Sequence, residues 1–197
     1  MKKFFAVLLV ILAGAMPLRA DDVADVKAVI LKEWELIAKG DFVGVLPLLT
    51  QDYRGLFKRR VGYEQAKWMF LGLDGKHPEE FYLFVGWSFK VECCYGGTEL
   101  TPEEVEECRN AAREAMKNPG SVKKYEKDAA EMSARFKAWA ENILKTHKFI
   151  SVKVDGDSAV AEFECKFEDN GGISKSGAVR LRRENGVWRI CGDDECN

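Results

Sequence analysis

Three side chains carry the chemistry of general acid–base catalysis, in which a positioned group gives or takes a proton at the reacting atom. Asp52 and Tyr53 are adjacent and would present a carboxylate beside a phenol, and His77 offers an imidazole. An aspartate that follows a helix commonly caps backbone N–H groups, and a histidine in a turn before a proline is expected to be exposed. We therefore expect no catalytic residue, and we keep Asp52, Tyr53 and His77 as the candidates if the protein is an enzyme.

Other catalytic signatures do not occur in the sequence. It has no nucleophile elbow, zinc-protease motif, phosphate-binding loop or dinucleotide-binding glycine pattern, so we expect no cofactor. A reactive cysteine needs a base beside it, and neither histidine has an assignable cysteine neighbour. His147 stands where a long helix is expected to meet a strand, a position where an imidazole stabilises the C-terminal end of the helix.

The cysteines form an even set of six, as in proteins with a disulfide framework. They are Cys93, Cys94, Cys108, Cys165, Cys191 and Cys196. No pair has C-x-x-C spacing, and two histidines supply few further ligands, so we expect no metal. We expect structural disulfides, with a preference for Cys93 or Cys94 joined to Cys108, and for Cys191 joined to Cys196. Cys165 also suits a buried position on an apolar strand face.

Aromatic side chains are the candidates for lining a pocket that binds a small apolar molecule. They are Trp34, Tyr53, Phe57, Trp68, Trp87, Phe163 and Trp188. Such residues more often form the core, because a domain of this size must bury several large side chains.

The N-terminus has the layout of a secretory signal peptide over residues 1–20: two lysines, an apolar run and a small residue at Ala20. The apolar run is too short to span a bilayer, and no later segment approaches the roughly 20 apolar residues of a spanning helix. We expect cleavage after Ala20 and export to the periplasm or outside the cell. The remaining residues 21–197 carry a net charge of about −5, so the composition gives no sign of the basic surface that binds nucleic acid.

Helical periodicity predicts a helix over residues 22–39, a short one from Asp41 to Leu49 and a third from Tyr63 to about Leu71. Residues 74–78 are expected to form a turn. From Trp87 to Cys93, apolar side chains alternate with polar ones, which predicts a half-buried strand.

Residues 98–146 predict a long helical hairpin. Thr101 begins a capping box with Pro102 at the first helical position, and residues 118–120 break the chain before Ser121, which can cap a second helix. Apolar residues repeat at heptad spacing from Val122 to Ile143. The two helices are expected to pack antiparallel, and either to close over the core of the domain or to dock a partner.

The last fifty residues predict a β-meander with strands at 149–154, 158–167, 177–183 and 187–191. One face is apolar, and the other alternates acidic and basic residues, so the sheet should cover a core on one side and meet solvent on the other. None of the positions predicted to face inward is an ordinary general acid or base. They are Ala159, Ala161, Phe163, Cys165, Phe167, Val179, Leu181, Trp188 and Ile190.

Two stretches resemble the nuclear transport factor 2-like superfamily, which includes ketosteroid isomerase and polyketide cyclase-like proteins. LKEWELIAKGDFVGVLPLLTQDY looks like its first helices, and VKVDGDSAVAEFECKF followed by GAVRLRRENGVWRI looks like its final sheet. The resemblance covers residues 22–72 and 147–192. It implies a single α+β domain over residues 21–197, in which N-terminal helices pack on a curved antiparallel sheet around a cone-shaped pocket. The hairpin at 98–146 departs from this pattern and would plug or cover the pocket.

We expect from these observations an exported, non-catalytic domain, monomeric or homodimeric, that binds a small apolar molecule or another exported protein. One alternative is an enzyme of the isomerase, dehydratase or cyclase kind with an acid–base residue in the pocket. The other is an interaction protein that docks a partner through the hairpin at 101–146. Because one fold hosts many functions, the site has to decide between them.

Overall fold

Six helical segments and a four-stranded sheet make up the part of the chain that the computed structural model describes, which is residues 20–55, 61–93, 101–167 and 173–192. The helical segments are α2 (Ala20–Lys39), the 3-10 helix η1 (Val43–Leu48), α3 (Tyr63–Leu73), α4 (Pro78–Cys93), α5 (Pro102–Met116) and α6 (Pro119–Thr146). Two short strands, β1 (Arg54–Gly55) and β2 (Val61–Gly62), pair with each other.

The main sheet is antiparallel, with its strands in the order β3-β4-β5-β6. The strands are β3 (Lys148–Asp155), β4 (Ser158–Phe167), β5 (Ile173–Glu184) and β6 (Val187–Gly192), which confirms the predicted meander. Asn185 and Gly186 both have positive φ, 53° and 80°, as a tight hairpin turn between two right-twisted strands requires.

The sheet has one buried face and one polar face, as its alternation predicts. Its buried side chains are Ala159, Ala161, Cys165, Val179, Leu181, Trp188 and Ile190. On the other face Glu162, Glu164 and Lys166 are exposed, and Arg189 forms a cross-strand ion pair with Glu184 at 3.6 Å.

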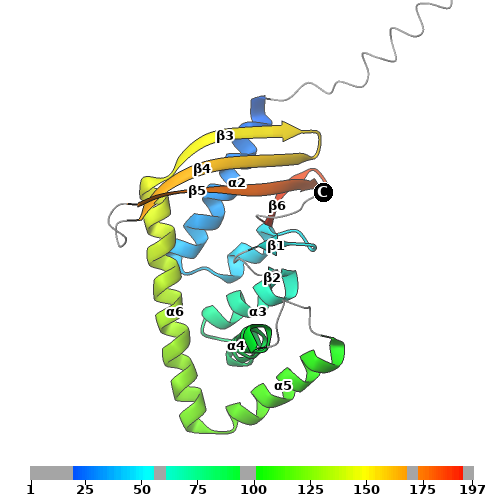
Figure 1. Ribbon diagram of the computed structural model, residues 1–197, viewed down its shortest axis with the longest axis vertical. Helices are drawn as coiled ribbons and strands as arrows, with labels where there is room; N and C mark the ends of the chain where they lie inside the picture. Colours follow the sequence, from blue (N-terminus) through cyan, green and yellow to red (C-terminus); the bar gives the residue numbers. More distant parts are fainter. Residues whose placement is uncertain (1–19, 56–60, 94–100, 168–172, 193–197) are drawn as a thin grey trace, which may run out of the picture.

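Helices cover the buried face of the sheet, so the expected α+β class with helices on a curved antiparallel sheet is confirmed. α2 crosses behind the strands, and α6 runs along one side of the molecule from the sheet to the layer of α3, α4 and α5 (Figure 1). One cluster of buried side chains joins α2, η1, α3, α4, α6 and the sheet.

The strand predicted between Trp87 and Cys93 is wrong, because these residues belong to α4. Residues four apart share a face in a helix as they do in a strand, so Trp87 and Val91 fit both periods. The buried residues Phe81, Phe84 and Trp87 recur at the three-residue spacing of a helix face.

The two consecutive helices predicted within residues 101–146 are confirmed, including the capping box in which Thr101 and Glu104 exchange hydrogen bonds. Asn118, not Ser121, caps α6: its side chain accepts a hydrogen bond from the N–H of Gly120 at 2.8 Å, with Pro119 at the first helical position. The two helices do not run alongside each other, because α5 packs on α4 and diverges from α6 (Figure 1).

The predicted heptad stripe of α6 faces inward over most of its length. Tyr125, Ala129 and Ile143 are buried, whereas Trp139 is 37% exposed and Ala140 is buried in its place. This shift follows from the 3.6-residue turn of a straight helix, which drifts away from a seven-residue repeat.

Candidate functional site

The aromatic residues proposed as a pocket lining form part of the core in this structure. Trp34, Tyr53, Trp68, Trp87 and Trp188 are each at most 5% exposed. Phe163 is half-buried, and Phe57 lies outside the described residues.

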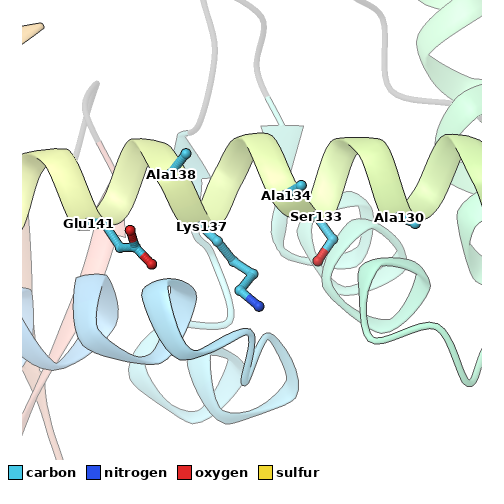
Figure 2. A pocket seen from close by; sticks show the side chains of 6 residues that line it. All are labelled: Ala130, Ser133, Ala134, Lys137, Ala138 and Glu141. Atoms are coloured by element: carbon cyan, nitrogen blue, oxygen red, sulfur yellow. The ribbon is translucent and has the colours of Figure 1, made fainter. Parts of the chain in front are cut away.

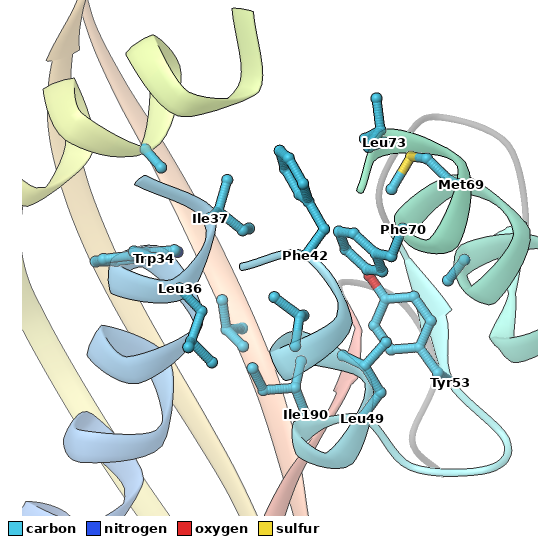
Figure 3. Packing of buried hydrophobic residues seen from close by; sticks show 14 of the residues in the cluster. Trp34, Leu36, Ile37, Phe42, Leu49, Tyr53, Met69, Phe70, Leu73 and Ile190 are labelled. Carbon is cyan, nitrogen blue, oxygen red and sulfur yellow. The ribbon is translucent and has the colours of Figure 1, made fainter. Parts of the chain in front are cut away.

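The rings around Trp34 pack directly on one another. The centroid of Trp34 lies 5.1 Å from that of Phe163, 5.4 Å from that of His147 and 6.2 Å from that of Phe149. Trp34 and Tyr53 do not meet: in Figure 3 the side chains of Phe42, Phe70 and other apolar residues lie between them. The described rings around Trp34 therefore pack on one another as core side chains do.

Asp52, Tyr53 and His77 lie in three different environments. Tyr53 is 2% exposed, and His77 is exposed in the turn that precedes α4. The side chain of Asp52 is 54% exposed and accepts a hydrogen bond from Nη2 of Arg182 at 2.6 Å, on the polar face of the sheet. The structure therefore does not bring the three candidates together into an acid–base site.

The electrostatics of Asp52 do not favour a role as a proton donor. Partial burial raises the pKa of this carboxyl, but the hydrogen bond from Arg182 and its positive charge outweigh that effect, so the pKa lies below its ordinary value. Asp52 is consequently ionised at neutral pH, whereas a general acid must hold its proton there.

His147 has the structural role that its position predicted. Its ring nitrogen Nδ1 lies 3.1 Å from the carbonyl oxygens of both Ile143 and Leu144, at the C-terminal end of α6. Because carbonyl oxygens only accept, Nδ1 is the protonated nitrogen and donates to them. The imidazole thereby adds a side-chain donor at the end of α6, where the carbonyl of Ile143 also accepts a hydrogen bond from the backbone N–H of His147 at 2.8 Å.

Glu33 is a buried carboxylate that the sequence analysis did not single out. It is 7% exposed, on the same side of α2 as Ile30 and Ile37, which precede and follow it by three and four residues. The sequence did contain a signal for this burial, because an acidic residue at that spacing lies within the apolar stripe of the helix. Among the side chains of the described chain that are classed as buried, it is the one carboxyl group, and a carboxyl group has the chemistry of a general acid or base that the predicted inward strand positions lack.

A second missed group is Arg183, at the edge of the buried face of the sheet. Its guanidinium stacks on the ring of Trp188 at 4.4 Å and forms an ion pair with Asp22 near the start of α2. The stacking shields the ion pair from water, and together they fasten the N-terminal turn of α2 to β5 and β6.

Three cysteines have described side chains. Cys165 and Cys191 are buried, Cys108 is half-buried, and Cys191 is disulfide-bonded. The expected pairings also involve Cys93, Cys94 and Cys196, whose side chains lie outside the described part, so the pairings stay predictions.

A depression lies along α6, on the side next to the end of α2 (Figure 2). This shallow depression of about 390 Å³ is lined by Ala130, Ser133, Ala134, Lys137, Ala138 and Glu141. Figure 2 shows the side chain of Lys137 pointing towards the end of α2, in agreement with its position beside Gly40. None of the predicted ligand-binding residues lines this depression.

Two features are absent from the described residues. No group of three or more histidine, cysteine, aspartate or glutamate side chains is arranged to hold a metal ion in the described ranges. No helix in the same ranges has both the length and the apolar character needed to cross a membrane.

No protein family and no curated protein matches the sequence. Among solved structures, the chain is similar to an NTF2-like designed protein, with 11% identity, 86% of this chain and 95% of that chain covered, and a TM-score of 0.39. It is also similar to a putative calcium/calmodulin-dependent protein kinase II association domain from Xanthomonas campestris, with 13% identity, 85% and 81% coverage and a TM-score of 0.28.

A third similarity is to a de novo designed protein with a curved β-sheet. The identity is 30%, but only 30% of this chain and 59% of that chain are covered, and the TM-score is 0.21. Since all three TM-scores are below 0.5, none of these similarities assigns the chain to a family.

Proposed function

We propose that the protein is an exported, non-catalytic domain of the nuclear transport factor 2-like superfamily that acts by binding another exported protein. The observation that carries the proposal is the close packing around Trp34: its side chain is 2% exposed, and its ring is in contact with those of Phe163, Phe149 and His147. Aromatic rings that pack on one another in this way act as core residues, which favours binding at the surface of the protein. A protein partner is therefore favoured over a small apolar molecule.

The experiment on the interior uses the apolar dye anilinonaphthalenesulfonate with the folded protein. We expect no saturable binding to the wild type, because the rings around Trp34 leave no room for the dye. The Trp34→Ala variant, where it folds, is the matched control, since a dry cavity lined by aromatic rings accepts small apolar molecules. Stoichiometric binding to the wild type would show an open pocket and overturn the proposal.

Export is tested on the protein made in its own cell. Residues 1–20 predict that the N-terminal sequence of the protein in the exported fraction begins at Asp21. A protein that keeps residues 1–20 and stays inside the cell would contradict this part of the proposal.

The protein partner is tested by crosslinking in living cells. We expect one defined crosslinked product with the exported protein, and none with a chain that lacks residues 1–20, because that chain does not reach the compartment of the partner. A product that is equally abundant with both chains would place the partner inside the cell and refute the proposal.

A second candidate function, an acid–base enzyme, is favoured by the burial of Glu33. It is tested by following hydrogen–deuterium exchange at the carbon beside the carbonyl of a cyclic enone in heavy water, a proton transfer that needs only a positioned base. An enzyme would accelerate this exchange and would lose the activity in Glu33→Gln but not in the half-buried control Glu35→Gln. The non-catalytic proposal expects no acceleration by the wild type.

A further inference from the structure

The bond at which the sequence predicts cleavage lies inside a helix. Residues 1–20 predict cleavage between Ala20 and Asp21, and α2 begins at Ala20, so this bond belongs to the first turn of α2. Proteases bind the chain around the bond that they cut in an extended form, and they act on a folded protein where a segment opens locally. Cleavage of the folded chain therefore requires the first turn of α2 to unwind.

The side chain of Asp22 attaches this first turn to the sheet. It is 14% exposed and forms an ion pair with Arg183 of β5. The guanidinium of Arg183 lies 4.4 Å from the centre of the Trp188 ring, and Trp188 is 4% exposed. Because the stacked ring keeps water from one side of the guanidinium, separating it from Asp22 costs more than separating a fully exposed pair.

A further acid contacts Arg183 but does not replace Asp22. The carboxylate of Asp157 lies 3.9 Å from the guanidinium, and its side chain is 75% exposed. The first buried residues of α2 follow soon after Asp22, since Val26 and Ile30 are both 0% exposed. Unwinding the start of the helix therefore breaks the ion pair first, and unwinding that continues exposes apolar surface to water.

The two partners of the ion pair are far apart in the sequence. Asp22 belongs to the first helix of the described chain, and Arg183 belongs to β5, the third strand of the main sheet. At about 5–20 residues per second, synthesis of the 161 residues that separate them takes roughly 8–30 s. The first turn of α2 has no partner in β5 during that interval, so the bond before Asp21 is accessible.

We propose that docking of the first turn of α2 on β5 and β6 protects the bond between Ala20 and Asp21, so that residues 1–20 have to be removed before the sheet is complete. Cleavage adds water across this bond and leaves a carboxylate on Ala20 and an amino group on Asp21. A chain that folds first keeps its N-terminal segment. The inference rests on the proposed export, because it needs a segment that is cleaved after Ala20, and the experiments separate the two.

The first experiment compares a peptide with the folded protein. A synthetic peptide of residues 1–30 and the folded chain of residues 1–197 are each incubated with a purified signal peptidase in detergent micelles, and the products are identified by mass. We expect cleavage of the peptide after Ala20, and cleavage of the folded chain at least tenfold more slowly. Equal rates would overturn the proposed protection and leave export standing. A peptide that stays intact, or is cut at another bond, would contradict both proposals.

The second experiment changes Arg183, which lies too far along the chain to be part of the sequence that the peptidase binds. Arg183→Gln removes the charge that pairs with Asp22, and cleavage of the folded chain should become about tenfold faster. Arg182→Gln is the matched control, because Arg182 is the next residue of the same strand and pairs with Asp52 and Glu184. The control should be cleaved at the wild-type rate. Equal acceleration by both variants would show a general loss of stability and would overturn the role of the ion pair.

Hydrogen exchange gives a measurement that does not use a peptidase. In the chain of residues 21–197, Arg183→Gln should accelerate exchange of the backbone amides in the first two turns of α2, and Arg182→Gln should not. The amides at the end of α2, near Lys39, should exchange at the wild-type rate in both variants. Unchanged exchange at the start of α2 in Arg183→Gln would show that the ion pair does not hold this turn and would overturn the proposal.

Discussion

Replacing Trp34 by alanine should be among the most destabilising changes in this protein. The side chain is 2% exposed and contacts three other rings. A buried tryptophan removes roughly 150–250 Å² from water, and truncating one to alanine typically costs about 3–5 kcal/mol. For a domain of this size, that loss corresponds to a fall in melting temperature of roughly 6–20 °C.

The assay is urea-induced unfolding of the wild type and the variant, with the free energy of unfolding extrapolated to water. Trp139→Ala is the matched control, because Trp139 also lies in a helix but is 37% exposed. We expect the control to lose much less stability, since less of its surface is removed from water on folding. If the two variants lose equal amounts of stability, the packing of α2 described above is incorrect.

Three further predictions concern other positions. In Gly72→Ala the new Cβ would lie 2.5 Å from the Cβ of Phe81 and 2.6 Å from its Cα, so the free energy of unfolding should fall in the same urea titrations. In Gly86→Ala the new Cβ meets nothing within 4 Å, and the free energy of unfolding should rise by about 0.5–1 kcal/mol. The pKa of Tyr125 is raised by burial to about 12, so absorbance at alkaline pH should show one tyrosine that ionises late. Stability should fall as the pH rises from about 10 through 12, and Tyr125→Phe should remove that dependence. The pKa of Asp52 is lowered in the folded protein, so its ionised carboxyl adds a small amount to the free energy of unfolding above its unfolded pKa. This contribution is lost as the pH falls through the folded pKa, so the free energies of unfolding of the wild type and Asp52→Asn should converge in acid.

Much of the fold could be predicted because its local signals agree with one another. The turns of the meander, the capping box at Thr101 and the periodicity of α2 each specify a local structure that long-range packing then preserves. The error at α4 has a local cause as well. The start signal Pro78-Glu79-Glu80 resembles the Pro102-Glu103-Glu104 that opens α5, and it outweighs an alternation that fits both helix and strand.

The candidate site could be predicted less well, because it depends on which residues meet in three dimensions. The types of Asp52, Tyr53 and His77 suit proton transfer, but their distances from one another are set by the packing of α3 against α4 and η1, and of η1 against β6. Glu33 shows the converse. Its burial could be predicted, because it lies three residues after Ile30 and four before Ile37 and therefore shares their face of α2. A periodicity count that considers only apolar residues passes over such an acid.

The direction of α5 could not be predicted from the hairpin alone. A short turn allows a range of angles between two helices, and the choice depends on where apolar surface is available. Here α4, whose residues 87–93 the sequence analysis assigned to a strand, offers that surface. The error at α4 and the expectation of an antiparallel pair are therefore linked.

At 28 residues, α6 extends for about 42 Å. It contacts α2 and β4 near one end, and α3, α4 and α5 near the other. Because one continuous helix packs against both regions, unfolding at one end of α6 removes contacts that stabilise the other end. We therefore expect the sheet and the distant helices to unfold together. Slowly exchanging amides in both regions should lose their protection together, which would give the chain a single cooperative folding unit.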